Sequence, residues 1–113
     1  MVKHISYPKD TISREAYNKL IRSHPDRIPV IVTELHHGLE LRKTKFLVPL
    51  DLTVGQLHYV FRKSLKLKDN ESIFAFVSNQ HLLQTSMMMS EVHENYNSDG
   101  FVKIALYKEN TFG

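Results

Sequence analysis

The feature that most constrains the fold is the start of a helix near the middle of the chain. Thr53-Val54-Gly55-Gln56 matches a capping box. In this motif the threonine hydroxyl accepts a hydrogen bond from the glutamine N–H, and the glutamine side chain reaches back to the threonine N–H. Leu52 before the cap and Leu57 inside the helix form the accompanying hydrophobic staple. The pattern predicts a helix over residues 54–64.

Strand patterns lie on both sides of this helix. Residues 28–32 are apolar and mostly β-branched, which is typical of a strand buried on both faces. Residues 43–50 alternate well enough for a second strand, in which Pro49 favours an edge position. The remaining predicted elements are a helix over 11–22 stopped by Pro25, a strand over 72–77, a helix over 87–95 capped near Ser86, and a strand over 101–107.

The order helix, strand, strand, helix, strand, helix, strand predicts an α+β fold. We expect a four-stranded mixed sheet with helices on one face, because a crossover helix separates two pairs of strand patterns. This outline fits a ubiquitin-like β-grasp with an added N-terminal helical segment. We therefore expect one compact unit, in which residues 1–24 form a helical extension and residues 25–113 form a ubiquitin-like domain with a flexible tail, 108–113.

Composition excludes several classes of protein. A chain of 113 residues with 42% hydrophobic content is long enough for one core and too short for two. The absence of cysteine excludes disulfides, cysteine catalysis and cysteine zinc sites within the chain, and it is compatible with the cytoplasm. No apolar run approaches the 20 or so residues that span a bilayer, so membrane action would require an attached anchor.

Neither charge nor motifs indicate an enzyme, a metalloprotein or a nucleic-acid-binding protein. The net charge of +3 comes from scattered basic residues, so we expect no nucleic-acid partner. The seven histidines show no recognised zinc spacing, and we expect no metal site and no cofactor. Glycine patterns for nucleotide binding or a serine nucleophile are absent from the sequence.

Six stretches share their order and spacing with one known family from about Ser23 to the end of the chain. They are HPDRIPVIV (24–32), KFLVP (45–49), DLTVGQL (51–57), RK (62–63), FVSN (76–79) and the terminal FG (112–113). Together they resemble the autophagy ubiquitin-like modifiers that include GABARAP and microtubule-associated protein light chain three. The connection 34–42 is shorter than is usual in that family, and 79–90 departs from its pattern. These departures affect partner preference more than the fold.

The resemblance implies a function centred on Gly113. Activating and conjugating enzymes of the autophagy pathway would pass its carboxylate to the amine of phosphatidylethanolamine, and Phe112 would be read by a processing cysteine protease. The lipid would hold a cytoplasmic protein on the autophagosomal membrane, because two acyl chains anchor stably where one is marginal. The sequence leaves open whether Gly113 is the natural end of the protein or the result of trimming. It also leaves open two other functions: an unconjugated peptide-binding module, and a modifier that is conjugated to other proteins.

The resemblance also implies that the strand over 43–50 lies at a sheet edge and adds an extended peptide from a cargo receptor. Such peptides have the pattern aromatic-x-x-aliphatic. The implied aromatic pocket comprises Leu20, Pro29, Lys45, Leu47 and Phe101. The implied aliphatic pocket comprises Phe46, Val48, Pro49, Leu52, Leu57 and Val60. The implied charged rim comprises Arg27, Lys43 and Arg62, together with Lys45.

Strand alternation would direct Leu47 to one pocket and its neighbours Phe46 and Val48 to the other. For Leu57 and Val60, ordinary core packing is an equally good interpretation. For Phe46 and Lys45 we favour the pocket, because an aromatic residue beside a lysine on an edge strand is poorly explained by core packing. We expect the double substitution of Phe46 and Leu47 by alanine to abolish peptide binding with the fold intact.

Overall fold

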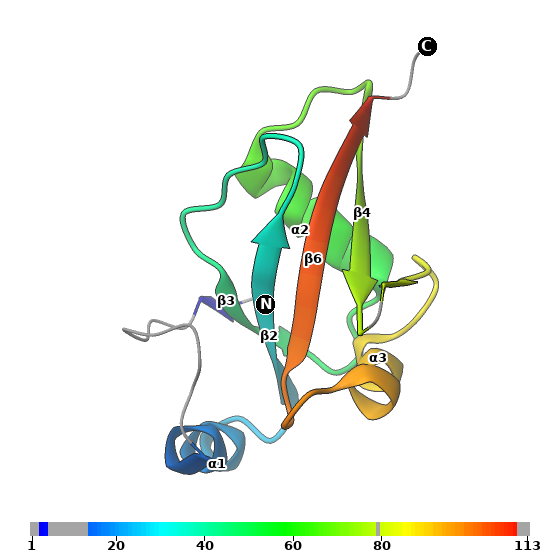
Figure 1. The fold of residues 1–113 in the computed structure, drawn as a ribbon. Coiled ribbons are helices and arrows are strands. Elements are labelled where there is room, and N and C mark those ends of the chain that lie inside the picture. The colour runs from blue at the N-terminus through cyan, green and yellow to red at the C-terminus, as the bar shows by residue number, and fades with distance from the viewer. Residues whose placement is uncertain (1–2, 5–13, 79, 111–113) are drawn as a thin grey trace.

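The computed structural model describes residues 3–4, 14–78 and 80–110, which form six strands and three helices (Figure 1). In chain order these elements are β1 (Lys3–His4), α1 (Arg14–Ser23), β2 (Arg27–Leu35), β3 (Lys45–Pro49), α2 (Val54–Leu65), β4 (Glu71–Val77), β5 (His81–Leu82), α3 (Met89–Tyr96) and β6 (Val102–Asn110).

The strands form one mixed sheet in the order β1-β3-β2-β6-β4-β5. The central strands β2 and β6 run parallel, and every other neighbouring pair is antiparallel. This confirms the α+β class and the mixed sheet of a β-grasp fold. The predicted number of strands was wrong, since β1 and β5 add two short strands at the outer edges. A strand of two residues is too short to produce an alternating pattern.

The predicted start of α2 is confirmed in atomic detail. The N–H of Gln56 donates to the Thr53 hydroxyl at 3.1 Å, and the N–H of Thr53 donates to the Gln56 side-chain oxygen at 2.9 Å. These bonds satisfy backbone N–H groups that have no partner inside the helix. Leu57 and Phe61 are then buried on one face of α2, which fixes how this helix packs on the sheet.

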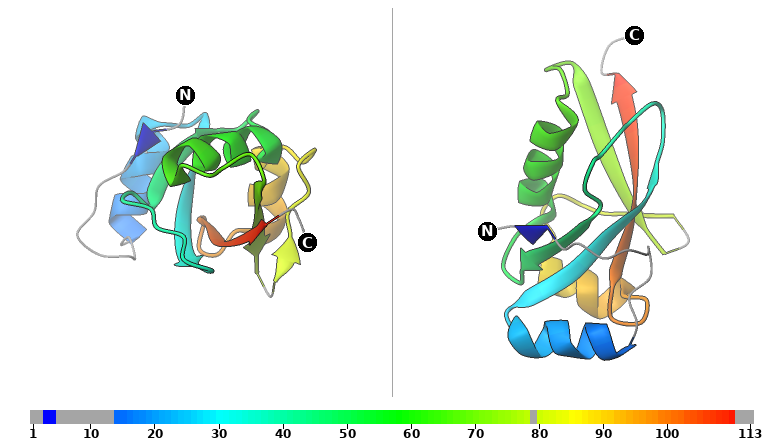
Figure 2. Two further views of the ribbon diagram at one scale, coloured as in Figure 1. Left: turned by 90° about the horizontal axis from the view of Figure 1, so that it is seen from above. Right: turned by 90° about the vertical axis from the view of Figure 1, so that its left-hand side faces the viewer.

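The core lies between the sheet and the helices α2 and α3. Side chains of both helices, such as Phe61 and Val92, join those of the sheet in one buried cluster. The prediction of helices on one face therefore holds for α2 and α3. The helix α1 lies instead at the end of the sheet where β2 begins (Figures 1 and 2). Its Leu20 is buried but does not belong to the core cluster.

Three predicted boundaries need correction. The helix α3 begins at Met89, and its first turn is supported by the Glu91 carboxylate, which accepts the Met88 N–H at 3.1 Å; Ser86 is not its cap. The described part of α1 begins at Arg14 and ends one residue later than predicted, at Ser23. The strand β6 continues to Asn110 and pairs with β4 along this stretch, so 108–110 belong to the sheet rather than to the tail.

The longest described helix, α2, has 12 residues, and neither it nor another helix of the described residues could cross a membrane.

Candidate functional site

The predicted site is organised around β3, whose neighbours in sequence point to opposite faces of the sheet. The register with β2 places Phe46 opposite Val30 and Leu47 opposite Pro29. Phe46 and Val30 belong to the core cluster, whereas Leu47 does not. Strand alternation thus puts Phe46 and Val48 on one face and Lys45 and Leu47 on the other, but it puts Pro49, which we predicted with Phe46, on the face of Leu47. Their assignment to peptide pockets stays a prediction.

Most of the predicted aliphatic set belongs to the core between β3 and α2. Four of its members, Val48, Leu52, Leu57 and Phe46, are at most 7% exposed and belong to the core cluster. The Phe46 ring contacts Phe61 of α2 edge-on, with 5.8 Å between the ring centroids. Core packing thus explains the apolar aromatic side chain at position 46, although from the sequence we favoured a peptide pocket over the core for Phe46. Pro49 and Val60 are only half-buried, so this set reaches the surface through them.

The predicted aromatic set lies on the opposite face. The β2–β3 register brings together Pro29, Leu47 and the neighbouring Lys45. Phe101 directly precedes Val102, which pairs with Val30 of β2, so Phe101 comes beside this group. All four side chains are buried, and so is Leu20 on α1. Lys45 is only 6% exposed, which is rare for a lysine, and its contribution to the charge around the groove stays a prediction.

The edge of β3 is not free, which corrects the predicted sheet edge. The strand β1 pairs antiparallel with β3 on the side away from β2, with Lys3 opposite Leu47 and His4 opposite Phe46. In Figures 1 and 2 this short strand, in dark blue, lies against β3. The N-terminal residues gave no signal for it, because two residues carry no periodicity.

The predicted rim residues come from three different parts of the fold. The guanidinium of Arg62 donates to the carbonyl oxygens of Glu71 and Lys68, at 3.1 Å for the second. Arg62 therefore holds the connection between α2 and β4. Lys43 is exposed just before β3, and Arg27 is half-buried at the start of β2. Of the three residues, only Lys43 is an exposed charge beside β3.

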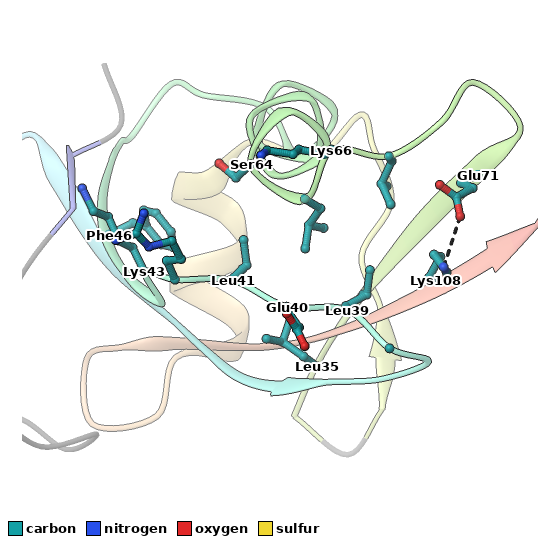
Figure 3. A pocket seen from close by; sticks show the side chains of 14 residues that line it. Leu35, Leu39, Glu40, Leu41, Lys43, Phe46, Ser64, Lys66, Glu71 and Lys108 are labelled. Carbon is teal, nitrogen blue, oxygen red and sulfur yellow. Dashed lines mark ion pairs between the residues drawn. The ribbon is translucent and has the colours of Figure 1, made fainter.

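A cavity of about 1100 Å³, which the sequence did not predict, opens between the connection from β2 to β3 and the end of α2 (Figure 3). Phe46 and Lys43 line one side, and the ion pair between Lys108 Nζ and Glu71 Oε2, at 3.1 Å, lines the other. The hydrogen bond from the Lys68 N–H, and to a smaller extent the one from the Lys108 ammonium, hold the pKa of the Glu71 carboxyl below its usual range. The apolar wall of the cavity consists of five leucines from β2, the connection to β3, and the end of α2 with the residues after it: Leu35, Leu39, Leu41, Leu65 and Leu67.

Phe112 and Gly113 lie outside the described residues. In the part of the chain that the structure describes, no group of three or more histidine, aspartate or glutamate side chains could hold a metal ion. His58 on α2 is half-buried, and burial, followed by the nearby charge of Arg62, lowers its pKa.

Comparisons with known proteins agree on one family. The family described as "Autophagy protein Atg8 ubiquitin like" matches residues 13–113. Autophagy-related protein 8c of Arabidopsis thaliana is 46% identical over 99 residues, which cover 85% of this chain and 82% of that protein. Autophagy-related protein 8a of the same plant is 42% identical over 112 residues, covering 96% and 90%. A crystal structure of Trypanosoma brucei ATG8 is similar with a TM-score of 0.77 and 34% identity, covering 96% of this chain and 99% of that one.

Proposed function

The chain belongs to the Atg8 family of ubiquitin-like autophagy proteins, and from this premise we propose that it is conjugated through Gly113 to phosphatidylethanolamine and binds short peptides on autophagic membranes. As a member it is a ubiquitin-like modifier and not an enzyme. The observation that carries the proposal is the family match itself, which extends to the terminal glycine at residue 113.

The proposed chemistry uses the carboxylate of Gly113. An activating enzyme forms the acyl adenylate from ATP with release of pyrophosphate. A cysteine thiol of that enzyme displaces AMP to give a thioester, and exchange with a cysteine thiol of the conjugating enzyme gives a second thioester and frees the first thiol. The lipid amine attacks the thioester carbonyl, an amide bond forms and the thiol leaves. Glycine suits this transfer because it has no Cβ and enters a narrow cleft. A cysteine protease that reads Phe112 would process or release the protein.

The arrangement around β3 supports the proposed peptide binding. One face of β3 carries Leu47 beside Pro29 and Lys45, and the other carries Phe46 and Val48, so an apolar group lies on each face of the strand along which we place the peptide. Side chains at alternate peptide positions serve opposite faces in such an added strand. Lys43 supplies exposed positive charge for the acidic residues of the peptide. The proposed partners are cargo receptors that carry aromatic-x-x-aliphatic motifs.

The conjugation is tested by reconstitution with active autophagy activating and conjugating enzymes, ATP and vesicles that contain phosphatidylethanolamine, followed by intact mass measurement. We expect a lipid-sized increase for the wild type and none for Gly113→Ala. A control modifier of known activity verifies the enzymes. An unmodified wild type beside a modified control would overturn the proposed conjugation. An isopeptide bond to a protein lysine would show that the target of conjugation is a protein and not the lipid.

A further inference from the structure

The strand β1 occupies the backbone edge that the proposed peptide would use. β3 has one neighbour on each side, β2 on the inner side and β1 on the outer side. The outer pairing sets Lys3 opposite Leu47 and His4 opposite Phe46, which are the second and third residues of β3. The part of the edge that β1 covers is therefore the part that lies between the two proposed peptide pockets.

β1 and a peptide cannot pair with β3 at the same time. β3 has five residues, and its last, Pro49, has no N–H to donate. Any run of three consecutive residues within it includes Leu47, which already faces Lys3. Each backbone N–H and C=O of the outer edge serves one neighbouring strand, so a peptide that pairs over three residues must take the place of β1.

The covering strand is short enough to be replaced. Two residues of β1 supply only a few backbone hydrogen bonds, and such a short strand bearing a lysine is a common protection of a sheet edge. A peptide that pairs over more residues and also fills two apolar pockets offers more contacts than β1 does. The edge is thus protected in the absence of a peptide and open to exchange in its presence.

We propose that β1 is a built-in competitor for the peptide edge of β3, which lowers peptide affinity until a peptide displaces Lys3 and His4. This inference rests on the proposed peptide binding and concerns its regulation. The apparent dissociation constant of a site that is free for only a fraction of the time rises by the inverse of that fraction. For an edge that is open in about a tenth to a third of the molecules, removing β1 tightens binding about threefold to tenfold.

The test compares two full-length double variants that differ in the backbone. Lys3→Pro with His4→Pro removes both N–H donors and disfavours strand pairing. Lys3→Ala with His4→Ala removes the same side chains and keeps both donors. The probe is a fluorescein-labelled synthetic peptide with an acidic run followed by Trp-x-x-Leu, and its dissociation constant is measured by fluorescence anisotropy. Amide hydrogen exchange of Leu47, measured by NMR without peptide, reports the cover directly, because the Val32 N–H donates to the Thr44 oxygen and the alternate position Phe46 therefore faces β2, which leaves Leu47 facing β1.

We expect the proline variant to bind the peptide about threefold to tenfold more tightly than the alanine variant and to exchange the Leu47 amide faster. Equal affinities in proteins that bind the peptide would overturn the competition and leave the proposed peptide binding intact. Unchanged amide exchange in the proline variant would show that β1 does not cover the edge. If no form binds the peptide, the proposed peptide binding fails, and the competition fails with it.

Discussion

Thr53 and Gln56 cap the start of α2 reciprocally. The Gln56 N–H donates to the Thr53 hydroxyl at 3.1 Å, and the Thr53 N–H donates to the Gln56 side-chain oxygen at 2.9 Å. Thr53→Ala removes the hydroxyl and should lower the free energy of unfolding by about 1 kcal/mol. Urea denaturation followed by circular dichroism measures the change. Thr53→Ser is the matched control, since it keeps the hydroxyl. An equal loss in both variants would contradict the role of the cap.

Phe46 contributes to the core before it contributes to any peptide pocket. It is 7% exposed and packs edge-on against Phe61. We therefore predict that Phe46→Ala lowers the free energy of unfolding by about 3–5 kcal/mol, as is usual for a phenylalanine removed from a core. This replaces our sequence-based expectation that alanine at Phe46 and Leu47 leaves the fold intact.

The control for Phe46→Ala is Leu82→Ala, which removes an apolar side chain that is 52% exposed. An exposed substitution of this kind should change stability by no more than about 0.5 kcal/mol. Urea midpoints for the two variants and the wild type decide the matter. A Phe46→Ala protein as stable as the Leu82→Ala protein would remove Phe46 from the core.

Lys43 is the exposed charge beside β3, and its reversal should weaken the binding of acidic peptides. We predict that Lys43→Glu raises the dissociation constant of the labelled Trp-x-x-Leu peptide about twofold to tenfold, because exposed charge pairs contribute modestly. The effect should shrink as salt is added. Lys63→Glu is the matched control, because it reverses the charge of another exposed lysine, on α2. The Lys63 ammonium lies over the exposed Tyr59 ring, 5.2 Å from its centroid. Equal losses in both variants would indicate a general effect of net charge.

Arg62 holds the connection between α2 and β4. Its guanidinium donates to the carbonyl oxygens of Glu71 and Lys68. Arg62→Ala leaves both oxygens without this donor, and we predict a loss of roughly 1–2 kcal/mol in the free energy of unfolding. Arg22→Ala, at an exposed position in α1, is the control and should change little. Thermal denaturation distinguishes them, and a fully stable Arg62→Ala protein would contradict this role.

The sequence predicts best those elements whose signal is local. The capping box from Thr53 to Gln56 depends only on neighbouring residues, and the structure reproduces it atom by atom. The β-branched run 28–32 is equally informative, because a strand buried on both faces has no polar positions, and all five of its residues are buried. The split of β3 into two faces also follows from strand alternation alone.

What the sequence does not reveal depends on partners distant in the chain. Phe46 looks like an edge residue until α2 brings Phe61 against it. Arg62 looks like a rim charge until the chain folds back and presents two carbonyl oxygens to it. The pairing of Lys3 with Leu47 joins positions 44 residues apart in number, and a strand of two residues has no pattern of its own. These contacts are set by the tertiary fold.

His58 should make the stability of the protein depend on pH. Burial first, and the charge of Arg62 second, lower its pKa from the ordinary value of 6.5. Its buried Nε2 has no hydrogen-bond partner among the residues that the structure describes. The unfolded chain therefore binds the proton more strongly than the folded protein does. The contribution of His58 to stability is complete above pH 6.5 and is lost as the pH falls toward the lowered pKa.

His58→Gln should remove this dependence, since glutamine does not titrate. Urea midpoints measured between about pH 5 and pH 7.5 give the slope, which for one histidine is at most about 1.4 kcal/mol per pH unit. His81→Gln, at an exposed position in β5, is the matched control and should keep the slope of the wild type. Parallel pH profiles for the wild type and His58→Gln would mean that other groups govern stability in this range, and the burial of His58 would then carry no measurable penalty on its protonation.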